Sequence, residues 1–518
     1  MARGDEHTLG RWISDRDLVT PDRIAIRFRG RDLSYRWLHE RSDQAAASLR
    51  DAGLARGDRI AVLAGNCPEY AAAVFGCAKA GLVVVPLSWR LAAAELGYQI
   101  ADADVALVVH DAANAGLASD ALKAVGAVGR DRPGGPGDPA LVELATLISP
   151  RRSATGDALG QEGVADSDPL FIVYTSGTTG RPKGAILTHA NCFWTNLSLD
   201  LTAGVAGSDR VLQVLPQFHI AGWNVQPLLA WWKGATVVLE ETFAPERVLR
   251  LIAEERITTM MGVPANYLFL AEHPDFAAAD LTSLRYLLVG GAPMPEPLLR
   301  RWTDRGVRIV QGYGLTEAAP NVLCLPPEDA ERMLGYAGKP YPYVDVAIAD
   351  PATGDIRTGP ATGELLVRGP NVFPGFWRNQ EASASALRDG WLHTGDIAER
   401  DDEGYYRIRD RLKDMYISGG ENVYPAEVEA VLHDHPAVAE AAVIAIGDPR
   451  WGEAGLAVVV TRAGHAVSEA ELREFCAGRI AGFKVPKTFR FTDGLPRSGM
   501  NKVLKSELRA RYASPETP

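Results

Sequence analysis

The chain has 518 residues, of which 47% are hydrophobic, 23% charged and 8% aromatic, and its formal net charge at pH 7 is -11. This composition is typical of a globular protein with a large core and excludes a disordered or fibrous chain. The acidic balance argues against a protein that binds chiefly to the phosphate backbone of a nucleic acid, because such proteins concentrate positive charge.

The length predicts more than one domain. The five cysteines are scattered and never stand as CxxC, a pattern that predicts neither a disulfide framework nor a zinc site and favours a reducing compartment. The N-terminal segment carries mixed charge without an apolar run, and no stretch reaches the roughly 18 apolar residues of a membrane span. We therefore expect a cytoplasmic protein without a transmembrane segment.

From about residue 55 onward, short apolar runs alternate with helical patterns, which is typical of buried parallel strands in βαβ units. The runs lie at residues 59–65, 82–87, 105–110, 171–175, 210–216, 235–240, 257–264, 285–291 and 307–314. Residues 111–167 are rich in Ala, Gly, Asp and Pro and predict an irregular connection.

After about residue 340 the pattern changes to short strand-like pieces at 344–350, 363–369 and 405–410, which predict a small β-rich subdomain. Residues 425–518 then read as helix, strand, strand, helix, strand, helix, with a capping box at Ser468. The expected class is α/β, with a large N-terminal domain over residues 1–411. A small, mobile α+β domain follows over residues 412–518.

The strongest local signal is the segment from Thr175 to Gly184, which follows an apolar strand directly and contains seven Gly, Ser or Thr residues. Hydroxyls and backbone N–H groups exposed by glycines can surround phosphate oxygens, while Lys183 supplies a point charge. The spacing differs from the GxxxxGK[ST] of P-loop NTPases. The alternative is an ordinary surface turn rich in Gly and Thr.

Further motifs follow this loop in a fixed order: PQFHIAGWN at 216–224, GGAP at 290–293, QGYGLTE at 311–317, WLHTGD at 391–396, DRLKD at 410–414 and GGENVYPAEVE at 419–429. Together they resemble the adenylate-forming superfamily of acyl- and aryl-CoA synthetases, luciferases and adenylation domains, over nearly the whole chain. Enzymes of that family join a carboxylate to AMP, release pyrophosphate, and then pass the acyl group to a thiol.

The resemblance implies ATP or acyl-AMP, Mg²⁺ and coenzyme A as cofactors. It implies that Tyr313 stacks on adenine, that Thr316 binds phosphate, and that Glu317 holds Mg²⁺, a hard cation that prefers oxygen ligands. Asp396 and Arg411 resemble the residues that hold the ribose hydroxyls. The implied nucleotide and coenzyme site also contains Thr175, Ser176, Gly177, Thr178, Thr179, Gly180, Gly291, Ala292, Pro293, Gly312, Gly314, Leu315, Ile408, Ser418, Gly419 and Gly420.

His219 stands where the family places a residue between the acyl pocket and the carboxylate, although a lone His in an apolar stretch is more often a core residue. Lys413 falls at the family's hinge. The residues expected to line the acyl pocket are mostly small, which favours a bulky hydrophobic acid: Ala221, Gly222, Trp223, Gly290, Ala318 and Ala319. Ala221 stands where phenylpropanoid-activating members of the family carry a tyrosine, so a flat phenolic acid lacks a stacking partner there, while Trp223 can wall an aliphatic or polycyclic body.

Lys502 matches the lysine that, in the family, bridges the carboxylate and the α-phosphate during adenylation. The residue before that lysine is usually Gly, but here it is Asn501. Because Asn adopts positive φ more readily than most residues, the loop can keep its shape. If it does not, Lys502 is misaimed in the first step only, since the lysine has rotated away in the transfer step.

These features favour an acyl-CoA ligase, an AMP-forming acid–thiol ligase. A second hypothesis is a ligase that only converts a preformed acyl adenylate into acyl-CoA, for which Asn501 is the reason. A third is a nucleotide-binding protein without catalysis, which the presence of Lys183, Glu317 and Lys502 disfavours. The luciferase branch of the family shares these motifs. An assay for light emission or oxygen uptake distinguishes a luciferase from a ligase, and we expect neither activity. The sequence does not decide between a monomer and a homodimer.

Overall fold

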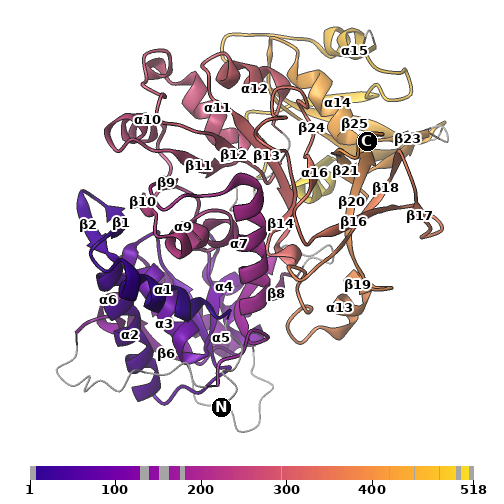
Figure 1. Ribbon diagram of the computed structural model, residues 1–518. Helices are drawn as coiled ribbons and strands as arrows, with labels where there is room; N and C mark the ends of the chain where they lie inside the picture. The colour runs from indigo at the N-terminus through magenta and orange to yellow at the C-terminus, as the bar shows by residue number, and fades with distance from the viewer. Residues whose placement is uncertain are drawn as a thin grey trace. The chain divides into compact units, whose positions relative to one another are not determined.

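The computed structural model describes residues 7–128, 139–150, 163–175, 181–292, 294–412, 414–418, 421–448, 450–477, 479–497 and 503–512 (Figure 1). The chain divides into two compact units, Met1–Val346 with Val367–His393, and Ala347–Leu366 with Thr394–Pro518. The expected α/β class, with a large N-terminal and a small C-terminal part, is confirmed. The boundary between residues 411 and 412 stays a prediction. None of the described helices is long and apolar enough to cross a membrane.

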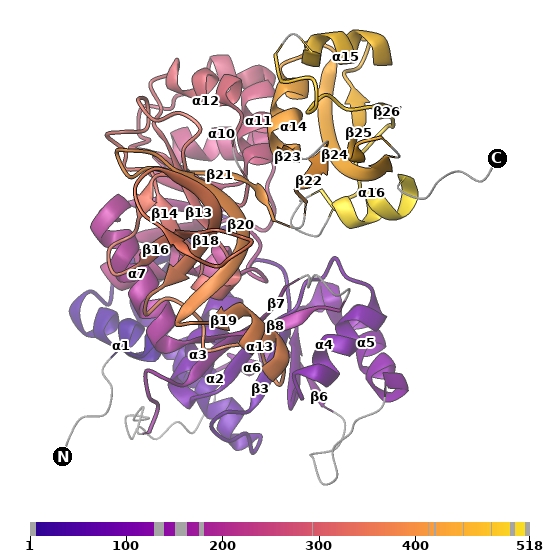
Figure 2. The same ribbon diagram turned by 90° about the vertical axis from the view of Figure 1, so that its right-hand side faces the viewer.

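One sheet of the larger unit has the strand order β6-β5-β3-β4-β7-β8. The strands are β3 (Arg59–Leu63), β4 (Val83–Pro86), β5 (Leu107–His110), β6 (Ala140–Glu143), β7 (Pro169–Thr175) and β8 (Lys183–Thr188). All pairs are parallel except β7 with β8. Helices α4 (Ala93–Asp102) and α5 (Ala115–Val128) pack on one face through a core that includes Leu63, Val85 and Leu96. Helices α2 (Tyr35–Asp51) and α3 (Pro68–Ala80) lie on the other side (Figure 2).

The prediction of an irregular connection over residues 111–167 is wrong in part. This segment contains α5, strand β6 and the short helix α6 (Leu144–Leu147). The sequence of α5 is rich in Ala, which has the highest helix propensity, so local propensity outweighs the scattered Gly. The most Gly- and Pro-rich part of the segment, 129–138, lies outside the described residues.

The second sheet has the order β15-β14-β13-β12-β11-β9-β10-β1-β2. Its strands are β1 (Ile24–Phe28), β2 (Arg31–Ser34), β9 (Arg210–Gln213), β10 (Thr236–Leu239), β11 (Thr259–Gly262), β12 (Leu287–Val289), β13 (Ile309–Gly314), β14 (Asn321–Cys324) and β15 (Lys339–Pro340). The strands from β13 to β1 pair in parallel, and the edges are antiparallel. One face packs on α10 (Pro245–Glu254), α11 (Pro264–Glu272) and α12 (Glu296–Thr303) through a core that includes Leu212, Leu287 and Trp302.

The remaining helices of the larger unit are α1 (Leu9–Val19), α7 (His189–Ala203), α8 (Ala221–Asn224), α9 (Pro227–Lys233) and α13 (Gln380–Ala386). The predicted β-rich subdomain is confirmed as a sheet with the order β17-β16-β18-β20-β19, in which β21 pairs with β20. Its strands are β16 (Asp345–Ala349), β17 (Ile356–Arg357), β18 (Ala361–Arg368), β19 (Leu387–Arg388), β20 (Trp391–Arg400) and β21 (Tyr406–Arg411).

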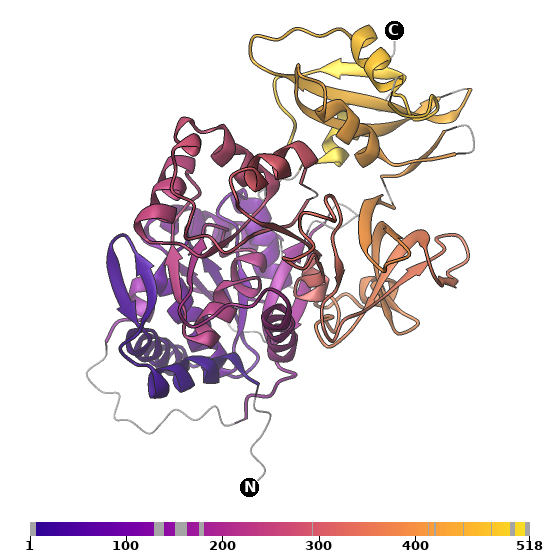
Figure 3. The same cartoon turned by 45° about the horizontal axis from the view of Figure 1, so that its top comes forward.

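The C-terminal region has the predicted order of helices and strands. It contains β22 (Tyr416–Ser418), β23 (Glu421–Val423), α14 (Pro425–His433), β24 (Val438–Asp448), β25 (Gly452–Thr461), α15 (Glu469–Ala477), β26 (Thr488–Phe491) and α16 (Lys505–Tyr512). Helices α14 and α15 pack on one face of the sheet and α16 on the other (Figure 3, orange to yellow). The capping box is confirmed, because Ser468 Oγ accepts from Glu471 N at 3.2 Å and Glu471 Oε2 accepts from Ser468 N at 2.7 Å.

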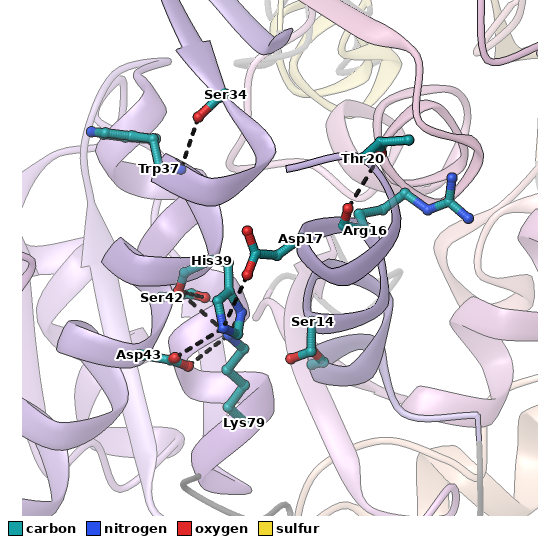
Figure 4. A network of polar contacts seen from close by, with 11 residues as sticks. Ser14, Arg16, Asp17, Thr20, Ser34, Trp37, His39, Ser42, Asp43 and Lys79 are labelled. Carbon is teal, nitrogen blue, oxygen red and sulfur yellow. Dashed lines mark hydrogen bonds and ion pairs between the residues drawn. The ribbon is translucent and has the colours of Figure 1, made fainter. Parts of the chain in front are cut away.

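A buried charged cluster joins α1, α2 and α3 (Figure 4). Lys79 is 2% exposed, and its ammonium group donates to Asp43 Oδ1 at 2.7 Å and to His39 Nδ1 at 2.9 Å. Because an ammonium group can only donate, His39 Nδ1 accepts and the neutral imidazole carries its proton on Nε2. That nitrogen lies 3.2 Å from Asp43 Oδ2 and 3.9 Å from Asp17 Oδ2. Burial, and then the charge of Lys79, lowers the pKa of His39, in agreement with a neutral ring.

The two halves of this ion pair should respond differently to substitution. Asp43→Ala leaves a buried ammonium group without its carboxylate, and we expect it to lower the free energy of unfolding by about 3 kcal/mol. Lys79→Met removes the buried charge and keeps its volume, while Asp43, 36% exposed, stays hydrated, so we expect a loss of about 1 kcal/mol. Urea unfolding of the two variants measures the difference. A larger loss from Lys79→Met would contradict this account.

Candidate active site

The carboxyl ends of several parallel strands meet at one edge of the second sheet. Strands β9, β11, β12 and β13 are parallel neighbours, and ligands commonly bind beyond the carboxyl ends of strands in open α/β sheets. Predicted site residues lie in the segments at these ends: 214–224 after β9, Gly290 and Gly291 after β12, and 312–319 at the end of β13. The topology therefore gathers the predicted acyl and adenine residues at one edge.

An asparagine that follows a strand of the other sheet, the one containing β3, is hydrogen-bonded to this edge. Asn66 follows β3, and its Oδ1 accepts from Gln217 N at 2.8 Å while its Nδ2 donates to Leu215 O at 2.9 Å. The backbone N of Cys67 donates to Gln217 Oε1 at 3.1 Å. The carboxyl end of β3 is thus bound to the segment that follows β9.

The two ends of the predicted phosphate loop lie together. Thr175 at the end of β7 is opposite Lys183 at the start of β8, and Thr175 Oγ1 donates to Lys183 O at 3.5 Å. The ammonium group of Lys183 lies 5.7 Å from the centroid of the Phe376 ring. The loop is therefore a connection between antiparallel strands at the carboxyl end of β7. Its members Ser176, Gly177, Thr178, Thr179 and Gly180 lie outside the described residues.

A tight turn holds the residues predicted to bind adenine and phosphate. Tyr313 lies in β13 opposite Leu323 of β14, and Leu315 N donates to Pro320 O at 3.0 Å. Thr316, Glu317 and Ala318 form a short 3-10 turn between the two strands. A Cβ atom on Gly314 would lie 1.7 Å from Pro320 O, so only glycine fits there.

Buried asparagines, which the sequence did not single out, support this turn. Asn224 Nδ2 donates to Ala319 O at 2.9 Å. Asn371 Nδ2 donates to Ala318 O at 3.1 Å and to Asn321 O at 2.8 Å. Asn224 is the last residue of the PQFHIAGWN motif, so its place in that motif could have pointed to the site, whereas Asn371 belongs to no motif. Because both side chains are at most 1% exposed, these bonds fix the turn away from competing water.

The residues predicted to line the acyl pocket differ in burial and in what their side chains contact. Ala318 and Ala319 are fully buried, and a Cβ atom on Gly290 would lie 3.0 Å from Met261 Cε. Trp223 is also fully buried: its Nε1 donates to Gln217 O at 2.6 Å and its ring packs edge-on against Tyr70 at 5.3 Å. Trp223 therefore belongs to the aromatic core, and its contact with substrate stays a prediction.

Two further residues predicted to line the acyl pocket lie in the same motif as Trp223. Ala221 begins helix α8 and is partly exposed. A Cβ atom on Gly222 would lie 2.5 Å from Pro216 O, which again requires glycine. The chain thus turns sharply after His219, and no bulky side chain fits at position 222.

His219 has an unusual environment. Its Nε2 is buried without a hydrogen-bond partner among the described residues, and its ring lies 4.5 Å from that of Phe218. Burial, and then the charge of Arg90, lowers the pKa of His219 to about 3. The imidazole is therefore neutral at pH 7, offering a polar atom to a bound molecule but no positive charge.

The smaller unit contains the residues predicted to hold the ribose. Asp396 on β20 is opposite Arg411 on β21, and Arg411 Nε lies 2.7 Å from Asp396 Oδ1. Asp396 is 4% exposed, and its backbone N donates to Thr394 Oγ1 at 3.1 Å. Ile408 lies opposite Ala398 on the same strand pair. The carboxylate of Asp396 is thus fixed in a partly desolvated position.

Ser418 is 1% exposed and lies opposite Glu421 in the β22–β23 pair. Gly291 adopts a left-handed φ of +79° and is exposed, as is Ala292. The predicted residues Pro293, Lys413, Gly419, Gly420, Asn501 and Lys502 lie outside the described residues. Within the part of the chain that the structure describes, no group of three or more His, Cys, Asp or Glu side chains could hold a metal ion.

Comparison with known proteins gives consistent matches over nearly the whole chain. The model of a family described as AMP-binding enzyme matches residues 14–377, and that of the AMP-binding enzyme C-terminal domain matches residues 427–502. A feruloyl-CoA synthase from Amycolatopsis sp is 42% identical over 504 residues, covering 97% of this chain and 99% of the relative. An indoleacetate–CoA ligase from Aromatoleum aromaticum is 40% identical over 510 residues, covering 98% of each. The crystal structure of ATP-bound MatB from Rhodopseudomonas palustris matches with a TM-score of 0.87 at 32% identity, covering 98% of this chain and 99% of that one.

The two glycines of the GYG segment should differ in their tolerance of a methyl group. Gly314→Ala brings Cβ against Pro320 O, and we expect it to lower the free energy of unfolding by about 2 kcal/mol or more. In Gly312→Ala the nearest atom is Leu323 O at 3.6 Å, an ordinary contact, so we expect a change below about 1 kcal/mol. Chemical unfolding of the ligand-free variants measures both. Equal losses would show that the turn is not as tight as described.

Proposed function

Because the chain belongs to the AMP-binding enzyme family and is an AMP-forming acid–thiol ligase, we propose that it activates a bulky hydrophobic carboxylic acid as the acyl adenylate and transfers the acyl group to coenzyme A. The observation that carries the substrate class is the set of small residues at the carboxyl edge of the second sheet. Gly290 leaves no side chain there, and Ala318 and Ala319 contribute only methyl groups, whereas Gly222 adds no room because Pro216 O occupies the place of a side chain.

The names of two relatives support the same class of acid. A feruloyl-CoA synthase and an indoleacetate–CoA ligase each act, by name, on an acid that carries an aromatic ring. Ferulate and indoleacetate share a planar apolar body with a carboxylate on a short arm. Acids of this kind, and aliphatic acids of similar bulk, are therefore the first to test.

In the first half-reaction a carboxylate oxygen attacks the α-phosphorus of ATP, a new P–O bond forms, and the bond to the β-phosphate oxygen breaks to release pyrophosphate. The reactants repel each other, by about 4 kcal/mol for each pair of unit charges 4 Å apart at an effective dielectric constant of 20. Lys183, at the base of the loop, supplies one compensating charge, and Lys502 supplies another. Glu317 would hold Mg²⁺ together with the phosphates, and the ion would neutralise further charge, since Mg²⁺ is usually held by one or two carboxylates together with phosphate oxygens.

In the second half-reaction the sulfur of coenzyme A attacks the acyl carbonyl, the C–S bond forms, and AMP leaves with the electron pair of the C–O bond. The thiol proton passes to solvent, because a thiol with a pKa near about 8.5 already supplies some thiolate at neutral pH. His219, with its pKa lowered to about 3, is too weak a base to take that proton at pH 7. We propose that it contacts the acyl group as a neutral hydrogen-bonding side chain.

The alternative is a ligase that performs only the second half-reaction. The reason to consider it is Asn501, which stands before Lys502 where the family usually has Gly. Both hypotheses share the adenylate and coenzyme A, and they differ only in whether ATP and the free acid suffice. A nucleotide-binding protein without catalysis differs from both, because it would convert neither the acid nor a supplied adenylate.

The proposed substrate class predicts the outcome of an acid panel. With ATP, Mg²⁺ and coenzyme A, ferulate, indoleacetate or a medium-length fatty acid should give a kcat/KM for pyrophosphate release at least tenfold above that of acetate, because acetate leaves the apolar pocket unfilled. Coupled pyrophosphate release and thioester formation are the measurements. Acetate turning over faster than every larger acid would contradict the proposed pocket.

The two half-reactions should be separable at Lys502. Lys502→Ala should lower ATP-dependent acyl-CoA formation by about 10² to 10³, the usual effect of removing one positioned electrostatic group. Acyl-CoA formation from a supplied acyl adenylate should change less than tenfold. If adenylation by the unmodified protein is slow, Asn501→Gly should raise it, since glycine adopts positive φ freely. Equal losses in both half-reactions for Lys502→Ala would overturn this assignment.

A further inference from the structure

We propose that helix α4 is a brace for the phosphate loop, with Tyr98 and Asp102 as positioning residues that hold its two ends. The role given to the loop rests on the proposed function. Neither residue belongs to any motif that the sequence singled out, and α4 lies more than 70 residues before the loop in the chain. The two residues are one helical turn apart, so their side chains project from the same face of α4.

Each of the two side chains contacts a different end of the loop. Tyr98 OH donates to the carbonyl oxygen of Pro182 at 3.2 Å, and Pro182 immediately precedes Lys183. Asp102 Oδ2 accepts from Tyr174 OH at 2.6 Å, and Tyr174 immediately precedes Thr175. Burial, and then the charge of Asp102, raises the pKa of Tyr174 far above its ordinary value, so its hydroxyl keeps the proton that it donates. One helical face therefore holds the chain where it enters the loop and where it leaves.

A third bond closes the arrangement on the β8 side. Trp377 Nε1 donates to the carbonyl oxygen of Asp102 at 3.1 Å, and the backbone N of Trp377 donates to Gly184 O at 2.7 Å. A Cβ atom on Gly184 would lie 2.6 Å from Ile172 Cγ2, so the backbone at this position is packed against the neighbouring strand. The residue after Lys183 is thus connected to the end of α4 through a single residue, Trp377.

Helix α4 is itself firmly placed. Leu96 and Ile100 on its apolar face are fully buried in the core that α4 shares with α5 and the sheet. At its first turn, Glu95 Oε2 accepts from Ala92 N at 2.8 Å. The apolar face fixes the helix on the sheet, which leaves Tyr98 and Asp102 to hold the loop. Figure 2 shows α4 beside β7 and β8, the strands that the loop joins.

The brace should matter for one half-reaction only. Adenylation needs Lys183 and the loop hydroxyls at fixed positions around the phosphates, and a displacement of about 1 Å in a reacting group can cost about 10² in rate. Transfer of the acyl group from AMP to sulfur takes place after pyrophosphate has left. Loosening the loop ends therefore weakens the use of ATP and spares the thiol step.

The test uses hydroxyl deletions in the full-length protein. Tyr98→Phe and Tyr174→Phe each remove one bond to the brace and keep the ring. Tyr286→Phe is the matched control, because its hydroxyl donates to a backbone carbonyl, Ala203 O, at 2.6 Å, elsewhere in the same unit. For each variant, kcat and KM for MgATP are measured in adenylation, alongside acyl-CoA formation from a supplied acyl adenylate. Calorimetry gives the Kd of MgATP without turnover.

We expect Tyr98→Phe and Tyr174→Phe each to lower kcat/KM for MgATP about fivefold, the usual worth of one hydrogen bond, and the double variant to lower it by tenfold or more. Acyl transfer from the supplied adenylate should stay within twofold in all variants, and Tyr286→Phe should stay within twofold in both reactions. A double variant with unchanged ATP kinetics, or one that loses both half-reactions equally, would overturn the brace. If the unmodified protein makes no acyl-CoA, the proposed function fails. The brace is then tested by the Kd of MgATP, which should rise in Tyr98→Phe and Tyr174→Phe and stay unchanged in Tyr286→Phe.

Discussion

The parallel pairing of β9, β11, β12 and β13 is the constraint on which the rest of the site depends. Parallel neighbours end at the same edge, so every segment that follows them is brought to one place whatever its sequence. Asn66 then binds the end of β3 in the other sheet to the segment after β9. The apolar strands thereby bring segments that lie far apart in the chain to one edge of the sheet. The predicted polar and glycine site residues lie in the turns at that edge.

Much of this arrangement could be predicted from sequence, because the apolar runs that become strands are short, frequent and bounded by turn residues. The order of elements in residues 425–518 was predictable for the same reason. Helix α5 was not, since the Gly and Pro signals that flank it outweighed its alanines in the sequence pattern. The sequence indicated that Trp223 lies near the site, but it could not show that the ring turns into the core, because a short helix has no periodicity long enough to define its faces.

The supporting contacts were the part that sequence could not supply. Gly314 is required by the carbonyl oxygen of Pro320, a contact that depends on the register of β13 with β14. Asn371 and Tyr98 act on backbone carbonyls that lie 50 or more residues away in the chain. A hydrogen bond from a side chain to a distant backbone atom leaves no spacing pattern in one sequence, so only the fold reveals which polar residues position the site.

The two half-reactions make opposite demands on these residues. In the proposed mechanism, the first brings a carboxylate against a polyphosphate and needs positive charge held in place. This is the role that we propose for Lys183, whose loop ends are bonded to α4, and for Lys502. The second attacks an activated acyl group and needs access for a thiol more than it needs charge. A neutral His219 is compatible with both, since it neither repels the cation of the loop nor competes with it.

The central claim, that the acid is activated through an acyl adenylate, is tested most directly by oxygen labelling. An accepted acid labelled with ¹⁸O in both carboxylate oxygens is turned over with ATP and coenzyme A, and the phosphorus products are examined by mass spectrometry. The account predicts one ¹⁸O atom in the phosphate of AMP and none in pyrophosphate, because the bridging carboxylate oxygen stays with AMP when sulfur attacks. Label in inorganic phosphate with ADP as the other product, or unlabelled AMP, would contradict it.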